Sequence, residues 1–279
     1  MVCMDALAEL KRKILRERGL DCERFKESFF VRRVMSRLRT TGQPSIRAYL
    51  RWLDQEPGEY ARLFDALSIN VTQFFRDETT FQLIQDTLLP TLLADKAAAH
   101  SQTLRVWSAG CATGEEAYSL AALLAAAMRH APAGLIAHVY GTDIDPGAVA
   151  QARRGVYEAA ALAGVAHPEA LGQFTQAGVW RASPALRQLV RFKVHDLTHD
   201  RPLRYIDLLL CRNVLIYFAR QTQERLLATL HAALNPDGFL VLGKTESITA
   251  EAKARFIAVD IKERIYRKPA QSPFFHRGQ

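Results

Sequence analysis

LRVWSAGCATGEEAYSLAALLAAAM, residues 104–128, is the stretch of this sequence that decides the fold. Gly110, Ala112 and Gly114 have little or no side chain, so the backbone can turn sharply there and a ligand can approach it closely. We therefore predict a strand, a tight turn and a helix, a unit that often holds a nucleotide-like cofactor. The same small residues would also suit a turn that only lets a helix pack closely against a strand.

The residues after the turn narrow the class of ligand. A phosphate-binding P-loop ends in Gly-Lys-Ser or Gly-Lys-Thr, whereas Gly114 is followed here by Glu115 and Glu116. Two carboxylates at a helix start interact well with the helix dipole, but they would repel a pyrophosphate. The turn therefore disfavours triphosphates and dinucleotides. It favours a cofactor with neutral hydroxyl groups and a positive centre.

A second acidic signal lies in IAHVYGTDIDPGAVAQAR, residues 136–153. An apolar strand there ends close to Asp143 and Asp145, just before a helix that begins at Pro146. An acidic side chain at the carboxyl end of the second strand is where an α/β fold binds ribose hydroxyls. Asp145 also fits the helix cap, with Pro146 at the first helical position. We predict that Asp143 binds ribose and that Asp145 caps the helix.

Length and composition describe an ordinary globular protein. The 279 residues are 49% hydrophobic and 24% charged, and the four cysteines form no CxxC pair and no metal-ligand spacing. The longest nearly uncharged apolar run, residues 117–128, is too short to span a bilayer. The amino terminus alternates charges and shows no signal peptide. We expect a cytoplasmic protein with reduced thiols, no metal site and no membrane insertion.

The charge is positive and concentrated at the front of the chain. The net charge is +8 and the sequence pI is about 9.5. Residues 1–40 carry eleven Lys and Arg against six Asp and Glu, a net charge of +5. Such an excess favours an acidic partner, which could be nucleic acid, an anionic membrane or an acidic protein surface.

The hydrophobic pattern divides the chain. Residues 1–90 show only helical spacing and predict an all-α domain, and residues 91–103 predict a linker around a bland Ala-rich tract. From 104 to 268 strands and helices alternate, which predicts an α/β domain with a mainly parallel sheet. The expected strands are 104–109, 136–142, 190–195, 206–211 and 239–243, followed by a closing pair near the end. Residues 160–190 fit the alternation poorly and predict an insertion, and 269–279 predict a tail.

Five segments resemble the chemotaxis receptor glutamate O-methyltransferases, the CheR family. They are LSINVTQFFRDE (67–78), VWSAGCATGEEAYSLA (106–121), GTDIDPGAVAQARRGVY (141–157), CRNVLIYF (211–218) and LNPDGFLVLGKTES (234–247). The resemblance implies a Rossmann-like S-adenosylmethionine-dependent methyltransferase domain with a small antiparallel β subdomain inserted, behind an all-α amino-terminal domain. It also implies methyl transfer to glutamates in the cytoplasmic helical bundle of chemoreceptors, giving glutamyl methyl esters and S-adenosylhomocysteine.

The resemblance assigns roles residue by residue. Arg76 and Tyr217 become candidate catalytic residues. The implied cofactor contacts are Asn70, Thr72, Arg76, Gly110, Glu115, Asp143, Asp196, Leu197 and Asn213. Asp196 departs from the family, which often has Asn there, so the hydrogen bond on the adenine side could differ.

The residue types agree with this chemistry. A glutamate with a pKa of about 4.3 is already ionised at neutral pH, so it can attack a sulfonium methyl group without a general base. Arg76 is suited to orient the substrate carboxylate, because a guanidinium presents paired donors. The alternative is that Arg76 only pairs with Asp77 or Glu78.

Substrate recognition is assigned to a basic helix. Arg32, Arg33, Arg37 and Arg39 flank an apolar stripe, and the family uses this helix to recognise acidic receptor helices. The alternative is that these arginines form a solvated charged face. The insertion is compact, QAGVWRASPALRQLVRF, and lacks the extra Gly-containing stretch of members that tether to a receptor's carboxy-terminal peptide. We therefore expect no dependence on that tether.

Two rival functions remain. A nucleic-acid methyltransferase would explain the basic front, but base-amino enzymes usually show an Asn/Asp-Pro-Pro-aromatic run where this chain has CRNVLIYF. We therefore expect no nucleic-acid partner. A non-catalytic cofactor-binding signalling scaffold would keep the same fold without turnover.

Overall fold

The computed structural model describes residues 4–68, 70–131, 133–163, 165–167, 171–176 and 178–270. The predicted tail lies outside these residues from 271 onward. The chain divides into two compact units: Met1–Ile69 with Ile216–Gln223, and Asn70–Leu215 with Glu224–Gln279. None of the described helices is long and apolar enough to cross a membrane.

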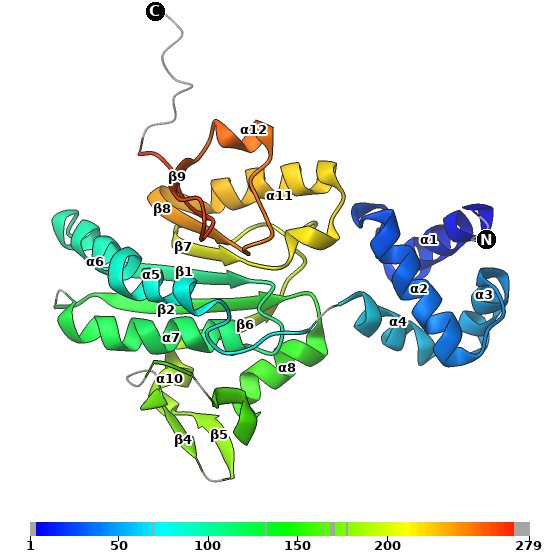
Figure 1. Ribbon diagram of the computed structural model, residues 1–279, viewed down its shortest axis with the longest axis horizontal. Helices are drawn as coiled ribbons and strands as arrows, with labels where there is room; N and C mark the ends of the chain where they lie inside the picture. The colour runs from blue at the N-terminus through cyan, green and yellow to red at the C-terminus, as the bar shows by residue number, and fades with distance from the viewer. Residues whose placement is uncertain are drawn as a thin grey trace, which may run out of the picture. The chain divides into compact units, whose positions relative to one another are not determined.

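The first unit is helical (Figure 1). It contains α1 (Met4–Arg18), α2 (Glu27–Thr41), α3 (Ile46–Gln55) and α4 (Glu59–Leu67), with a short 3₁₀ turn at Cys22–Arg24. Ser45 accepts a hydrogen bond from the Ala48 amide and caps α3, while Gly42 ends α2 with a φ of 67°. The four helices bury one apolar core, which includes Leu10, Phe30 and Leu63.

The second unit is built on a seven-stranded sheet in the order β6-β2-β1-β7-β8-β10-β9. The strands are β1 (Thr103–Ala109), β2 (Ile136–Asp143), β6 (Val190–Val194), β7 (Ile206–Cys211), β8 (Leu234–Leu242), β9 (Ile257–Asp260) and β10 (Ile265–Arg267). Five neighbouring strands, β6, β2, β1, β7 and β8, run parallel to one another. β10 is antiparallel to both of its neighbours, β8 and β9. The predicted mainly parallel sheet with a closing pair of strands is confirmed.

Helices cover the sheet and enclose a large core. α7 (Glu115–Ala127) contacts β1, β2 and β6, and α8 (Pro146–Arg154) contacts β2 and β6 (Figure 1). α11 (Arg220–Ala233) lies between β7 and β8 in the chain, and the short α12 (Ala250–Lys253) lies between β8 and β9. The core between sheet and α7 includes Leu104, Val139 and Leu123.

The insertion is a small antiparallel sheet, as predicted. Its strands are β3 (Val156–Glu158), β4 (Phe174–Gln176) and β5 (Val179–Ala182), in the order β3-β5-β4. It begins at 156, before the expected start near 160, and α10 (Pro184–Leu189) then leads into β6. β3 pairs with β5, which is why the strand directly after α8 belongs to the insertion.

The expected linker differs from the structure. Residues 78–98 form α5 (Glu78–Leu83), a π-helical turn (Ile84–Leu88) and α6 (Leu89–Ala98). They belong to the second unit, so the compact helical unit ends at Ile69 and not at 90. Leu88, Leu89 and Leu92 explain the difference, because they are buried in the core of the second unit. Only residues 99–102 separate α6 from β1.

Candidate active site

The carboxyl ends of the parallel strands meet at one edge of the sheet. The sheet order places β1 between β2 and β7, where the direction of strand succession reverses. In open α/β sheets, ligands bind outside the carboxyl ends of the strands at such a switch point. Most of the predicted cofactor residues follow these ends: Gly110, Glu115, Asp143, Asp196, Leu197 and Asn213.

The glycine turn after β1 is sterically tight. Gly110 has a φ of 78° and Gly114 a φ of 98°, values that favour glycine. A Cβ on Gly110 would lie 2.4 Å from Val214 Cγ2, and one on Gly114 would lie 2.7 Å from the Ala152 Cβ. Close packing between elements therefore requires both glycines, in addition to any role in ligand approach.

Asp143 ends β2 beside this turn. Its carboxylate accepts hydrogen bonds from the amides of Ala112 (2.8 Å) and Asp145 (3.0 Å). The side chain is nearly buried, and this burial raises the pKa of the carboxyl group above its usual value. The two amides hold the carboxylate in one orientation. Asp145 caps α8 through the amides of Gly147 and Ala148, as predicted.

Two carboxylates stand in the first turn of α7. Glu115 is nearly buried and accepts a hydrogen bond from the Thr113 hydroxyl (2.7 Å), and burial raises the pKa of its carboxyl group. Glu116 accepts from Ser108 Oγ at 2.8 Å and pairs with Arg212 at 3.2 Å. Burial also raises the pKa of Glu116, although Arg212 opposes this shift. The turn therefore places two carboxyl groups at the start of α7, of which Glu116 is already paired with Arg212.

The segment 70–77 is tied to the ends of two strands. Asn70 donates from Nδ2 to the Asp145 carboxylate at 2.6 Å, next to the end of β2. Arg76 donates from Nη1 to the main-chain oxygen of Val71 at 3.2 Å, and Thr72 between them is half-buried. The main-chain oxygen of Arg76 accepts from Arg212, which follows β7. Arg76 therefore lies on a segment that is hydrogen-bonded to residues beside the ends of β2 and β7. We call this segment, residues 70–77, the strap.

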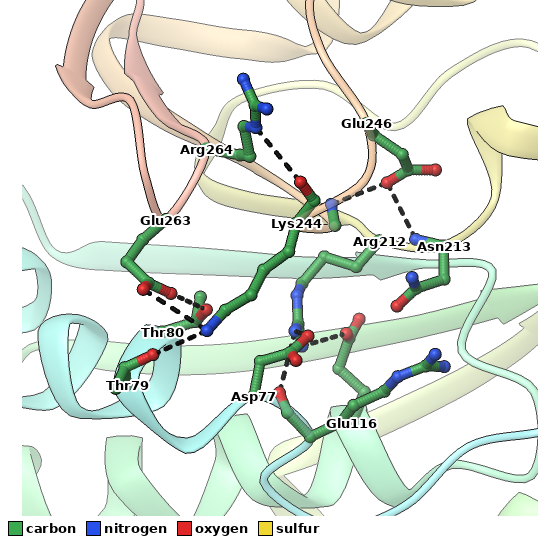
Figure 2. Close-up of polar contacts among 12 residues, drawn as sticks. Asp77, Thr79, Thr80, Glu116, Arg212, Asn213, Lys244, Glu246, Glu263 and Arg264 are labelled. Atoms are coloured by element: carbon green, nitrogen blue, oxygen red, sulfur yellow. Dashed lines mark hydrogen bonds and ion pairs between the residues drawn. The ribbon is translucent and has the colours of Figure 1, made fainter.

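The sequence left open that Arg76 pairs with Asp77. The structure shows a different partner for Asp77. The Asp77 carboxylate accepts from Arg212 Nη2 at 2.5 Å (Figure 2).

The ends of β6 and β7 carry the other predicted cofactor residues. The carboxylate of Asp196 accepts from the amide (2.8 Å) and hydroxyl (2.6 Å) of Thr198. Asp196 and Leu197 are half-buried. They directly follow His195, whose amide donates to the Asp143 main-chain oxygen. Asn213 has a φ of 59°, and its amide donates to Glu246 at 2.8 Å (Figure 2).

Five predicted site residues belong to the helical unit. The Tyr217 ring centroid lies 4.9 Å from that of Phe29, and the Tyr217 main-chain oxygen accepts from the Lys26 amide at 2.9 Å. On α2, Arg32 and Arg39 are exposed, whereas the Arg33 guanidinium lies 5.4 Å from the centroid of the Phe29 ring.

Arg37 has a structural partner inside the helical unit. Its Nε and Nη2 atoms each donate to the Glu59 carboxylate at 2.8 Å. Glu59 is fully buried and also accepts from the Tyr49 hydroxyl at 2.7 Å. Removing one partner of such a buried pair is strongly destabilising. Arg37 is therefore engaged in a structural ion pair, whereas Arg32 and Arg39 are exposed.

Sequence reasoning did not select two buried side chains of the site. Arg212 contacts Asp77, Glu116 and the Arg76 main chain, and Glu246 accepts from the amides of Asn213 (2.8 Å) and Gly243 (2.6 Å). Both stand inside the quoted segments CRNVLIYF and LNPDGFLVLGKTES. Both are charged residues that follow an apolar strand directly or within a few positions, and this was the signal in the sequence, although it does not identify their partners.

The donor set fits S-adenosylmethionine. The fixed carboxylate of Asp143 suits the hydroxyl groups of a ribose, and the Glu115 carboxyl group lies at the start of α7, beside the glycine turn. A Cβ at Gly110 would lie 2.4 Å from Val214 Cγ2, so only glycine fits at this point of the turn. Among the residues that the structure describes, no cluster of three or more His, Cys, Asp or Glu could hold a metal ion.

Comparison with known proteins identifies two domains. Residues 70–265 match the family model described as "CheR methyltransferase, SAM binding domain", and residues 5–68 match "CheR methyltransferase, all-alpha domain". The two matches meet near residue 69, where the first compact unit leaves off, but residues 216–223 of that unit lie within the match to the SAM binding domain.

Individual relatives are 27% to 34% identical to this chain. An uncharacterized 104.1 kDa protein of Rhodobacter capsulatus is 34% identical over 91% of this chain, which spans 27% of that relative. Chemotaxis protein methyltransferase 2 of Pseudomonas aeruginosa is 34% identical over 86% of this chain and 85% of its own length. The chemotaxis protein methyltransferase of Borreliella burgdorferi is 27% identical over 92% of this chain and 93% of its own length.

Proposed function

This chain belongs to the CheR methyltransferase family, and from that premise we propose that it methylates glutamate side chains of chemoreceptors. The products are glutamyl methyl esters and S-adenosylhomocysteine. A substrate in the cytoplasmic helical bundle of the receptor implies that the enzyme acts in the cytoplasm. Two relatives named as chemotaxis protein methyltransferases support this substrate class.

One observation carries the proposal at the level of the site. The hydrogen bond from Asn70 to Asp145 (2.6 Å) fastens the strap that bears Arg76 to the strand end that bears Asp143. A candidate substrate-orienting residue and a candidate ribose-binding residue are thereby held at the same edge of the sheet. Group transfer between a cofactor and a protein side chain requires this arrangement.

The chain's own residues have distinct tasks at this edge. When bound, S-adenosylmethionine supplies an electrophilic methyl group on a positive sulfur. Asp143 accepts hydrogen bonds from ribose hydroxyls, because its carboxylate is already fixed by two main-chain amides. Glu115 contributes negative charge beside the glycine turn, and Asn213 lines the end of β7.

The substrate needs orientation more than activation. Its glutamate is ionised near neutral pH because its pKa is about 4.3, so no side chain of the enzyme has to remove a proton. Arg76 presents planar paired donors to the carboxylate and holds one oxygen toward the methyl group. Orientation of this kind can supply several kcal/mol of the rate enhancement.

Methyl transfer to receptor-containing membranes tests the proposal. We expect wild-type protein to transfer the labelled methyl group of S-adenosylmethionine and the label to leave as volatile methanol in alkali, as an ester does. Arg76→Lys should lower kcat at least about tenfold and affect thermal stability much less, because a lysine lacks the planar pair of donors. Cofactor binding without transfer would favour a signalling scaffold, and alkali-stable label would exclude a glutamyl ester.

The insertion supports independence from a receptor-tail tether. β4 ends at Gln176 and β5 begins at Val179, so a very short connection joins them. No extra Gly-containing stretch extends this hairpin. Tight calorimetric binding of a free receptor-tail peptide would overturn this part of the proposal.

A further inference from the structure

The peptide that carries Arg76 has an unfavourable backbone conformation on both sides. Phe75 has a φ of 50° and Asp77 a φ of 62°, in the left-handed region that side-chain-bearing residues rarely adopt. Such residues persist only where their surroundings hold them, and they cluster at functional sites. The contacts that hold this peptide therefore decide where the Arg76 side chain points.

Arg212 supplies two of these contacts. Its Nη2 atom donates to the main-chain oxygen of Arg76 (2.8 Å). The same atom donates to the Asp77 carboxylate (2.5 Å) (Figure 2). On the amino-terminal side, the Phe75 amide donates to the Ser119 hydroxyl oxygen at 3.0 Å. Arg212 therefore holds the carboxyl-terminal half of the strained peptide.

Arg212 is itself fixed in place. Its side chain is only 1% exposed, and Nη1 pairs with Glu116 at 3.2 Å. Ser108 donates to the other oxygen of Glu116, and the Arg212 guanidinium lies 5.5 Å from the centroid of the Phe81 ring. A buried, doubly paired guanidinium is a rigid support, because its planar fork sets the directions of its hydrogen bonds.

We propose that Arg212 is a positioning residue that aims Arg76 at the substrate carboxylate. This proposal rests on the proposed function, since it takes Arg76 as the residue that orients the substrate. The strap has two anchors: Asn70 on Asp145 beside β2, and Arg76 with Asp77 on Arg212 beside β7. β2 and β7 flank β1 in the sheet, so the strap joins the strand ends on either side of the glycine turn.

Arg212→Lys is the informative change. A lysine keeps the positive charge and can pair with one carboxylate, but it cannot present a planar fork to Glu116, Asp77 and the Arg76 oxygen together. A catalytic group misplaced by about 1 Å can lose roughly 100-fold in rate. We therefore expect kcat to fall by about tenfold to 100-fold, while the KM for S-adenosylmethionine changes less than about threefold.

A kinetic double-mutant cycle separates positioning from general support. If Arg212 acts through Arg76, then Arg212→Lys lowers kcat by less than about twofold when Arg76→Lys is already present. If the factors by which the two changes lower kcat multiply fully in the double variant, the positioning role is refuted and the proposed function stays intact. A wild-type enzyme that transfers no methyl group would refute the proposed function instead.

Glu263→Gln is the matched control. Glu263 is also buried, pairs with Lys244 (3.4 Å) and accepts from the Thr80 hydroxyl (2.6 Å), at the start of α5 and three residues beyond Asp77 (Figure 2). This variant should keep kcat within about twofold of wild type. An equal loss of kcat in Glu263→Gln and Arg212→Lys would show that any weakened buried pair near α5 has the same effect, and it would overturn the proposal.

Hydrogen exchange followed by mass spectrometry gives a readout that needs no turnover. Arg212→Lys should speed amide exchange in residues 71–77, and Glu263→Gln should leave that segment unchanged. Unaltered exchange in Arg212→Lys would contradict the claim that Arg212 holds the strap, whether or not the protein methylates receptors.

Discussion

Asp143 is the single residue on which cofactor binding should depend most. Two main-chain amides fix its carboxylate before any ligand arrives. Asp143→Asn keeps the shape but removes the charge and turns one acceptor into a donor, so we expect S-adenosylhomocysteine affinity to fall at least about tenfold. Isothermal titration calorimetry measures this, with the exposed Asp65→Asn as the control that should bind as wild type does. Wild-type affinity in Asp143→Asn would remove this residue from the cofactor site.

Glu17 makes the stability of the helical unit depend on pH. Hydrogen bonds from Lys13 (2.8 Å) and the Tyr60 hydroxyl (2.5 Å) lower the pKa of Glu17 to about 2. Because the folded pKa lies below the unfolded value, ionised Glu17 stabilises the fold above about pH 4.5, and this contribution is lost as the pH falls toward about 2.

Denaturant unfolding checks this with Glu17→Gln. The variant should be less stable than wild type at about pH 6, and the difference should shrink at about pH 3. A difference that stays constant with pH would show that Glu17 does not act through its charge.

Local sequence could predict the residues whose task is set by their neighbours in the chain. Ser45 and Asp145 cap helices because cap geometry involves residues only two or three positions away. Arg212 could not be assigned this way, since Asp77 is 135 positions distant in the chain. Arg37 was interpreted as a surface residue for the same reason, because its partner Glu59 lies on another helix.

At the scale of elements, α2 divides its arginines between structure and surface. Arg32 and Arg39 are exposed, so we expect Arg32→Glu with Arg39→Glu to raise the KM for receptor without changing S-adenosylhomocysteine affinity. Methylation kinetics and calorimetry measure the two quantities. Charge reversal at the exposed Arg47 and Arg51 of α3 is the matched control. An equal rise of the KM for receptor in both double variants would show a general effect of net charge and not recognition by α2.

Residues 91–98 belong to α6 but were predicted as part of a linker. The bland Ala-rich tract in residues 91–103 was interpreted as a linker, because it follows Pro90 and a proline inside an α-helix clashes with the preceding turn. The structure instead places a π-helical turn, Ile84–Leu88, directly before α6, and Pro90 stands in the first turn of α6. The wider π turn and the early position of the proline let helical structure continue. Hydrophobic periodicity does not report such a local change of helix type.

At the scale of the whole molecule, the order of strands and helices was predictable because alternation along the chain dictates a parallel sheet. The return of residues 216–223 to the helical unit was not. It depends on contacts with residues nearly 200 positions earlier, such as the stacking of Phe25 on Phe218 and the hydrogen bond from the Ala219 amide to the Arg24 oxygen. Tyr217 lies in this returning segment, so its catalytic assignment stays a prediction.

Tandem mass spectrometry of a chemoreceptor incubated with this protein and S-adenosylmethionine tests the central claim most directly. We expect a mass increase of one methylene on glutamate side chains of the cytoplasmic helical bundle, present with wild type and strongly reduced with Arg76→Lys. A receptor that stays unmodified while the protein binds S-adenosylmethionine, or a methyl group found on a residue other than glutamate, would contradict it.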